Sequence, residues 1–86
     1  MTYTKEQMKV LAAWEEHLGT AVRANWARNP GREALRTIHS IYTAATGDRR
    51  RLVTTCSRCM LSLLQDAGRV YFRDLEEMKA KKKTKK

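Results

Sequence analysis

The stretch from Leu52 to Met78 constrains the fold most, because its apolar side chains keep a helical period over roughly seven turns. At 100° per residue, ten of them fall on one side of a helical wheel: Val53, Cys56, Met60, Leu63, Leu64, Ala67, Val70, Tyr71, Leu75 and Met78. Further apolar residues on both flanks widen this arc to roughly 200°, whereas a helix with one neighbour shows a stripe of about 100°. We therefore expect a long helix that contacts two partners.

Two shorter helices are predicted before it. Thr4–Gln7 fits a capping box, in which the Thr and Gln side chains satisfy exposed backbone donors at a helix start, and the helix should run to about Ala27. Gly19 lies inside it and could cause a local irregularity. Asn29 is a suitable N-cap and Pro30 a suitable first residue for a second helix, predicted to end near residue 45.

The start of the third helix has two alternatives. Gly47 ends the second helix, and Asp48 could cap the third directly. That start places Arg49–Arg51 in the first turn, where the helix dipole disfavours positive charge. A cap at Thr54 or Thr55 instead leaves the arginines in a basic loop, and we favour this second start.

No alternating run of β-branched residues predicts a sheet, so we expect an all-α fold: a small three-helix bundle with the third helix longest and central. The surplus apolar flank of that helix could pair two copies of the chain as a homodimer. The flank consists of Leu61, Leu64, Gly68 and Phe72.

Positive charge divides the chain into two parts. Of eighteen Lys and Arg residues, six are lysines within 79–86, which contains no acid; residues 1–78 hold twelve basic and nine acidic side chains. We assign 1–78 to the helical bundle domain and 79–86 to a lysine-rich tail. With no apolar side chain able to dock it, the tail should be disordered or a frayed helix end. It could serve as a solubilising terminus or as an arm for phosphate or an acidic protein.

Two cysteines form the most conspicuous short motif, Cys56-x-x-Cys59. A helix N-terminus and nearby arginines lower a thiol pKa, but a redox motif of this type follows a strand, and none is predicted. Zinc needs four ligands, and His17 and His39 are not spaced like a zinc-finger pair. Cys56 projects into the apolar arc, so we expect the thiols to pack as small hydrophobes, with Cys56 and Cys59 as lesser metal candidates. No cofactor is predicted.

The chain carries no signature of an enzyme. There is no Ser-His-Asp order, no phosphate-cradling glycine-rich loop and no paired-carboxylate pattern. Two cysteines so close in sequence make no disulfide framework, which favours a reducing compartment. The first six residues are polar and no apolar run approaches the ~20 residues of a membrane span, so we expect a cytoplasmic protein without a signal peptide or membrane contact.

Several short motifs resemble those of small uncharacterised phage-encoded helical proteins that carry a Thr/Ser-Cys-x-x-Cys box on their last helix. The resemblance rests on Ile41-Tyr42, Thr46-Gly47, Thr54-Thr55-Cys56-Ser57-Arg58-Cys59, Leu63-Leu64 and Gly68-Arg69-Val70-Tyr71-Phe72. It transfers no activity. It implies a phage accessory protein acting in the host cytoplasm: a nucleic-acid binder, a virion component or an inhibitor of a host nuclease of the anti-CRISPR kind.

The charge pattern favours a non-enzymatic protein that binds DNA or RNA. The predicted contacts are Arg49, Arg50, Arg51, Arg58, Arg69, Arg73, Lys81, Lys82 and Lys83. The alternative is a protein-binding accessory factor or inhibitor that recognises an acidic or nucleic-acid-binding protein. Basic charge argues against mimicry of DNA, which requires an acidic surface.

Overall fold

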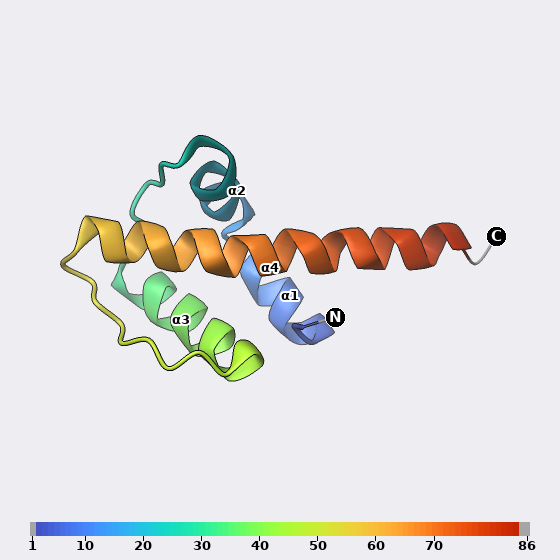
Figure 1. The fold of residues 1–86 in the computed structure, drawn as a ribbon, viewed down its shortest axis with the longest axis horizontal. Helices are drawn as coiled ribbons and strands as arrows, with labels where there is room; N and C mark the ends of the chain where they lie inside the picture. The colour runs from blue at the N-terminus through green and yellow to red at the C-terminus, as the bar shows by residue number, and fades with distance from the viewer. Residues whose placement is uncertain (1, 85–86) are drawn as a thin grey trace.

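The long C-terminal helix is the axis of the molecule. The computed structural model describes residues 2–84, with side chains described for residues 2–80. Four helices make up the secondary structure of this range: α1 Lys5–Ala12, α2 Glu15–Ala24, α3 Arg32–Thr46 and α4 Ser57–Thr84. In Figure 1, α2 lies on one side of α4 and α1 and α3 lie on the other. The all-α prediction is confirmed, and α4 contacts both α2 and α3 as its wide apolar arc requires.

The prediction of three helices is wrong because the first predicted helix is divided. The capping box at Thr4 and Gln7 is present, but the chain breaks after α1 rather than at Gly19. Ala13 and Trp14 donate their backbone N–H groups three residues back, to Val10 (3.2 Å) and Leu11 (2.9 Å), which tightens the turn. The turn redirects the chain so that α1 and α2 contribute separately to the core.

The boundaries of α2 and α3 also differ from the prediction. α2 ends at Ala24, where Asn25 adopts the left-handed conformation (φ 56°), and does not reach residue 27. α3 begins at Arg32 after Gly31 (φ 106°), so neither Asn29 nor Pro30 serves as predicted. The Asn29 side chain instead accepts the Gly31 N–H at 2.9 Å, a local turn that competes with helix capping.

The predicted C-terminal end of α3 and the basic loop after it are confirmed. Gly47 (φ 78°) donates its N–H to the Thr43 carbonyl at 2.9 Å and ends the helix. Arg49–Arg51 then lie in a loop, but α4 starts at Ser57, slightly later than a cap at Thr54 or Thr55 would place it.

Of the two predicted alternatives for the tail, the helix end agrees with the structure over residues 79–84, and the disordered tail does not. α4 is 28 residues long and stays helical through Thr84, extending beyond the other three helices in Figure 1. Lysine and alanine are good helix formers, and the packed turns before them remove the nucleation cost. Lys85 and Lys86 lie outside the described residues, as do the side chains of Lys81, Lys82 and Lys83.

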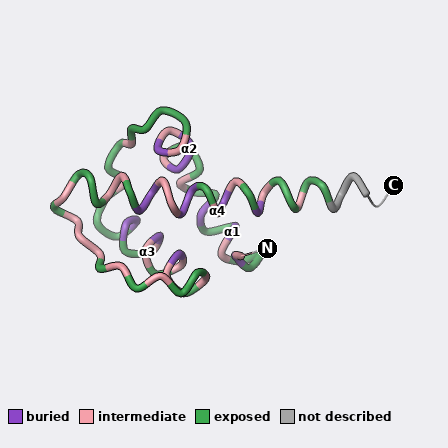
Figure 2. Tube along the Cα trace, viewed as in Figure 1, coloured by how far each residue is buried: buried purple, intermediate pink, exposed green. Residues whose placement is uncertain are grey.

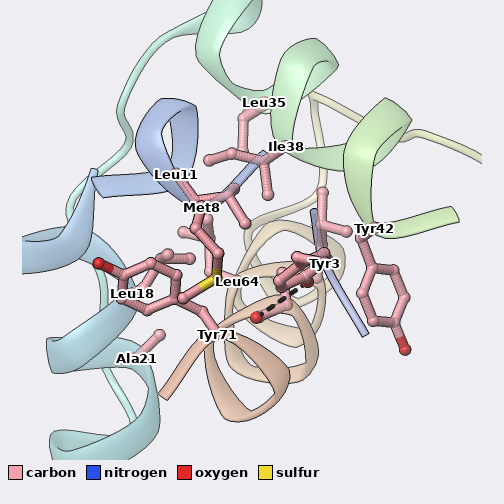
Figure 3. Packing of buried hydrophobic residues seen from close by; sticks show 12 residues of the cluster. Tyr3, Met8, Leu11, Leu18, Ala21, Leu35, Ile38, Tyr42, Leu64 and Tyr71 are labelled. Atoms are coloured by element: carbon pink, nitrogen blue, oxygen red, sulfur yellow. Dashed lines mark hydrogen bonds between the residues drawn. The ribbon is translucent and has the colours of Figure 1, made fainter. Parts of the chain in front are cut away.

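The core lies where the other three helices meet the middle of α4, and Figure 2 shows the buried positions gathered there. Its members come from every helix and from the segment before α1 (Figure 3): Tyr3, Met8, Leu11, Leu18, Ala21, Leu35, Ile38, Tyr42, Leu63, Leu64, Ala67 and Tyr71. The Tyr3 hydroxyl donates to the Ala67 carbonyl at 3.1 Å, so its polar atom is satisfied inside the core.

The proposed dimer flank of α4 is largely covered within the same chain. Leu64 is fully buried, and Gly68 lies so close to α2 that an added Cβ would stand 2.8 Å from Val22 Cγ2 and 3.1 Å from the Leu18 carbonyl oxygen. Phe72 packs at the edge of this contact: a Cβ added at Gly19 of α2 would lie 3.6 Å from Phe72 Cζ. Gly68 and Phe72 of this flank therefore lie against α2 and Leu64 is buried, whereas Leu61 is half-buried; a homodimer through this flank stays a prediction.

A buried carboxylate ties the N-terminal segment to α4. Asp74 is 0 % exposed. It accepts the Thr2 N–H at 3.0 and 2.9 Å and the Tyr3 N–H at 2.7 Å. Charge-assisted bonds of this kind are about twice as strong as neutral ones. The segment before α1 is thereby fixed against the helix that carries the proposed site.

Candidate nucleic-acid interface

Three of the predicted arginines lie on the exposed side of α4. Arg58, Arg69 and Arg73 are all exposed, and at 1.5 Å per residue the first and last are about 22 Å apart along the axis. Ser62, also exposed, lies between them on the same stripe. The helical period that buries Leu64 and Ala67 on one side thus places these guanidinium groups on the other.

Two of these arginines make weak contacts that a ligand can replace. Arg69 lies 3.1 Å from Asp66 Oδ1, but its side chain is 62 % exposed. Arg73 donates to the Thr2 hydroxyl at 3.2 Å. Exposed pairs of this kind contribute about 0–1 kcal/mol, so a phosphate can exchange for them at small cost. Within the described part of the chain, Arg49, Arg51 and Arg58 take part in no ion pair.

Arg50 has a different environment. Its side chain is only 26 % exposed; Nε donates to Asp48 Oδ2 at 3.0 Å, and Nη2 donates to Asp66 Oδ2. The guanidinium also lies over the Tyr42 ring, 5.1 Å from its centroid. Burial acts to lower the pKa of Arg50, but the bonds to Asp66 and Asp48 outweigh it and raise the pKa. Two carboxylates already neutralise this charge, so Arg50 is not available to bind a phosphate and does not belong to the candidate interface.

Arg50 instead anchors the basic loop to α3 and α4. Its backbone N–H donates to Asp48 Oδ1 at 2.9 Å, a bond that, as the largest of several causes, lowers the Asp48 pKa. His39 Nε2 lies 2.8 Å from the Arg50 carbonyl oxygen, and because a carbonyl only accepts, Nε2 carries the proton. Local sequence patterns do not reveal this network, because His39, Arg50 and Asp66 are far apart in the chain. It holds the neighbouring exposed residues, Arg49 and Arg51, at a defined place on the surface.

The lysine-rich end continues the same helix. Lys79 is exposed on α4, and the backbone of Lys81, Lys82 and Lys83 belongs to its last turns. The three predicted lysines therefore extend the rod that carries the arginines. Their side chains lie outside the described residues.

The two thiols are at the start of α4 and not in the core, so the expected packing as buried hydrophobes is wrong. Cys59 is exposed and Cys56 half-buried, because Cys56 precedes the first helical residue and the helical wheel does not apply to it. The Cys59 N–H donates to Cys56 Sγ at 3.2 Å. Hydrogen bonding from the Cys59 side chain, then from its amide, lowers the pKa of Cys56, and the pKa of Cys59 is raised in turn.

The histidines do not join the thiols. His39 binds the loop carbonyl described above, whereas the buried Nδ1 of His17 has no hydrogen-bond partner among the described residues. Over the described residues, no group of three or more His, Cys, Asp or Glu side chains is arranged to hold a metal ion. Nor is any helix among them both long and apolar enough to cross a bilayer.

A further concentration of positive charge escaped the sequence analysis. Residues 17–32 and 49–65 contain seven arginines between them and no Asp or Glu. A cleft joins the two segments: Asn25, Trp26, Ala27 and Asn29 line one wall, and Thr54, Thr55, Cys56, Ser57, Met60 and Leu61 line the other. A count of charge along the chain would have shown both acid-free segments, but only the fold shows that they meet.

Comparison with protein-family models, with curated proteins and with solved structures finds no match to this chain.

Proposed function

We propose that the protein binds nucleic acid without enzymatic activity, through the exposed arginines of α4 and the lysine-rich end of the same helix. The observation that carries the proposal is that one continuous helix holds Arg58, Arg69 and Arg73 on its solvent side and continues into the lysines. Guanidinium groups suit this ligand because their planar fork can donate two hydrogen bonds to a phosphate.

The structure of the bundle supports this use of α4. The opposite side of the helix is packed against α2 and α3, so the basic stripe is held on a rigid support. A rigid support lowers the entropic cost of binding, since fewer backbone rotations are lost than in a disordered arm. By the resemblance of the Cys box, we further propose that this is a phage accessory protein acting in the cytoplasm of its host.

Fluorescence anisotropy of labelled DNA and RNA at several salt concentrations tests the proposal. Each neutralised phosphate of duplex DNA contributes about −0.9 to the slope of log affinity against log salt. Arg58→Gln with Arg69→Gln should weaken binding and flatten the slope by about 2. Truncation after Met78 should flatten it further while leaving measurable binding.

The matched control removes two exposed charges from other helices, Lys9→Gln on α1 and Arg36→Gln on α3. It should leave the slope within about half a unit of wild type, because those residues lie outside the stripe. If the control and the α4 variant weaken binding equally, the interface is wrong. If wild-type protein does not bind DNA or RNA at about 50 mM salt, the proposal fails, and a protein partner becomes the better hypothesis.

A further inference from the structure

Trp26 is the most exposed large apolar side chain in the described part of the chain, at 57 %. A free indole of this size usually marks a contact with a ligand or partner, since burial of an aromatic ring contributes strongly to binding. Trp14, the other tryptophan, is half-buried and packs against the core. The exposure of Trp26 therefore needs a separate explanation.

The backbone around Trp26 is held in place. Asn25, in the left-handed conformation, ends α2 directly before it. Gln65 of α4 reaches across, and its Nε2 donates to the Ala21 carbonyl at 3.1 Å and to Asn25 Oδ1. The indole thus extends from a turn that is tied to α4, and its placement costs little additional ordering when a ligand binds.

The indole forms a wall shared by two clefts. One cleft is lined by Glu16, His17, Thr20, Trp26 and Arg28. The other is the cleft between residues 25–29 and 54–57, whose lining contains amide, hydroxyl and thiol groups but no Asp or Glu. A flat ligand can lie against the ring there with hydrogen-bonding groups around its edge. The first cleft suits an anion less well, because the Glu16 carboxylate repels it.

The charge around the second cleft identifies the ligand class. No arginine lines this cleft, but Arg28 and Arg58, both exposed, are next in sequence to lining residues of its two walls, and no Asp or Glu is among the lining residues. A ligand that combines a flat apolar ring with negative charge fits both features, and this is the chemistry of an unpaired nucleotide. Stacking of a base on an aromatic side chain requires that the base is not already stacked in a duplex.

We propose that Trp26 stacks on an unpaired base in the cleft beside Thr54–Ser57, so that the preferred ligand is single-stranded nucleic acid. This inference rests on the proposed function and adds to it the strandedness of the ligand. The arginines of α4 would bind phosphates in either form, whereas the Trp26 cleft distinguishes single strands from duplexes.

The test compares a 12-nucleotide oligo(dT) with a 12-base-pair duplex at the same salt concentration. Trp26→Ala should weaken binding of oligo(dT) by about 5- to 150-fold, the range for loss of one stacked base, and change duplex affinity less than twofold. Trp26→Phe should retain most of the affinity. Because stacking carries no charge, the salt slope of Trp26→Ala should equal that of wild type.

Tryptophan fluorescence supplies a second measurement, in which Trp26→Ala identifies the emission that comes from Trp14 alone. Oligo(dT) should quench the emission that wild-type protein has and Trp26→Ala lacks, and thymidine monophosphate should do so only at far higher concentration, because it lacks the other phosphate contacts. If Trp26→Ala binds oligo(dT) as well as wild type does, the stacking proposal is overturned while nucleic-acid binding stands. If Trp26→Ala weakens both ligands equally, strand selectivity is overturned. Absence of binding to either ligand overturns both proposals.

Discussion

Gly68→Ala should destabilise the protein, although alanine is the better helix former. Gly68 lies in the middle of α4 where that helix crosses α2. A Cβ at this position would be 2.8 Å from Val22 Cγ2 and 3.1 Å from the Leu18 carbonyl oxygen, and both distances are shorter than ordinary van der Waals contacts. The Val22 side chain has one strongly preferred rotamer in a helix, and the Leu18 oxygen is backbone, so neither moves easily.

The magnitude follows from two opposing effects. Glycine inside a helix costs about 1 kcal/mol relative to alanine, so propensity alone predicts stabilisation of that size. Insertion of a methyl group into a packed contact costs typically 1–3 kcal/mol, and a contact with backbone belongs at the upper end. We therefore expect a net loss of about 1–2 kcal/mol, or roughly 5–15 °C in Tm for a chain of this length.

Urea unfolding followed by circular dichroism at 222 nm measures this change. Ser62→Ala, at an exposed position of the same helix, is the matched control and should leave stability unchanged or raise it by a few tenths of a kcal/mol. Val22→Ala should partly rescue Gly68→Ala, with a favourable coupling of at least about 0.5 kcal/mol between the two sites. A Gly68→Ala protein that is more stable than wild type would refute the close approach of α2 and α4.

Three further perturbations follow from the packing. Leu63→Ala should cost about 2–5 kcal/mol in urea unfolding, because the residue is 3 % exposed in the core, and an unchanged Tm would contradict its central position. Asp74→Asn should cost about 2–3 kcal/mol, because it weakens the bonds to the Thr2 and Tyr3 amides, whereas Glu76→Gln at an exposed site should have no measurable effect. Burial, together with a 2.6 Å hydrogen bond to Glu15, raises the pKa of Tyr71 from 10.0 to about 12. The native state holds the Tyr71 hydroxyl proton up to a higher pH than the unfolded chain does. The stabilisation of the fold by this protonated hydroxyl is therefore complete below pH 10 and is lost between pH 10 and 12. Tyr71→Phe should reduce the fall in stability over that range, and an unchanged profile would contradict the assignment.

The features predicted correctly are those that depend on neighbouring residues. The Thr4–Gln7 capping box and the Gly47 helix end involve atoms three or four residues apart, and a side-chain pattern suffices to recognise them. The wide apolar arc of α4 correctly indicated two packing partners, since each partner needs its own apolar surface.

The errors arose where tertiary contacts compete with local preference. Asn29 and Pro30 form a good local helix start, yet Gly31 and Arg32 begin α3, because the chain must first pass from α2 to the other side of α4. The apolar stripe of the first predicted helix was real, but the turn at Ala13 and Trp14 divides it so that both parts can reach the core. A helical wheel shows that Leu64 and Gly68 lie on an apolar side of α4, but only the fold shows that Leu64 is buried and that Gly68 lies against α2.

The candidate site likewise has features that local sequence sets and features that tertiary contacts set. The sequence alone determined the helical class and the side of the central helix that carries Arg58, Arg69 and Arg73, because a helical period is set by the local backbone. Only the tertiary structure decided that Arg50 is held by Asp48 and Asp66, and that Trp26 faces the segment from Thr54 to Ser57. Those contacts join residues up to about thirty positions apart, and they form because burial of the core brings the helices together, which no local pattern records.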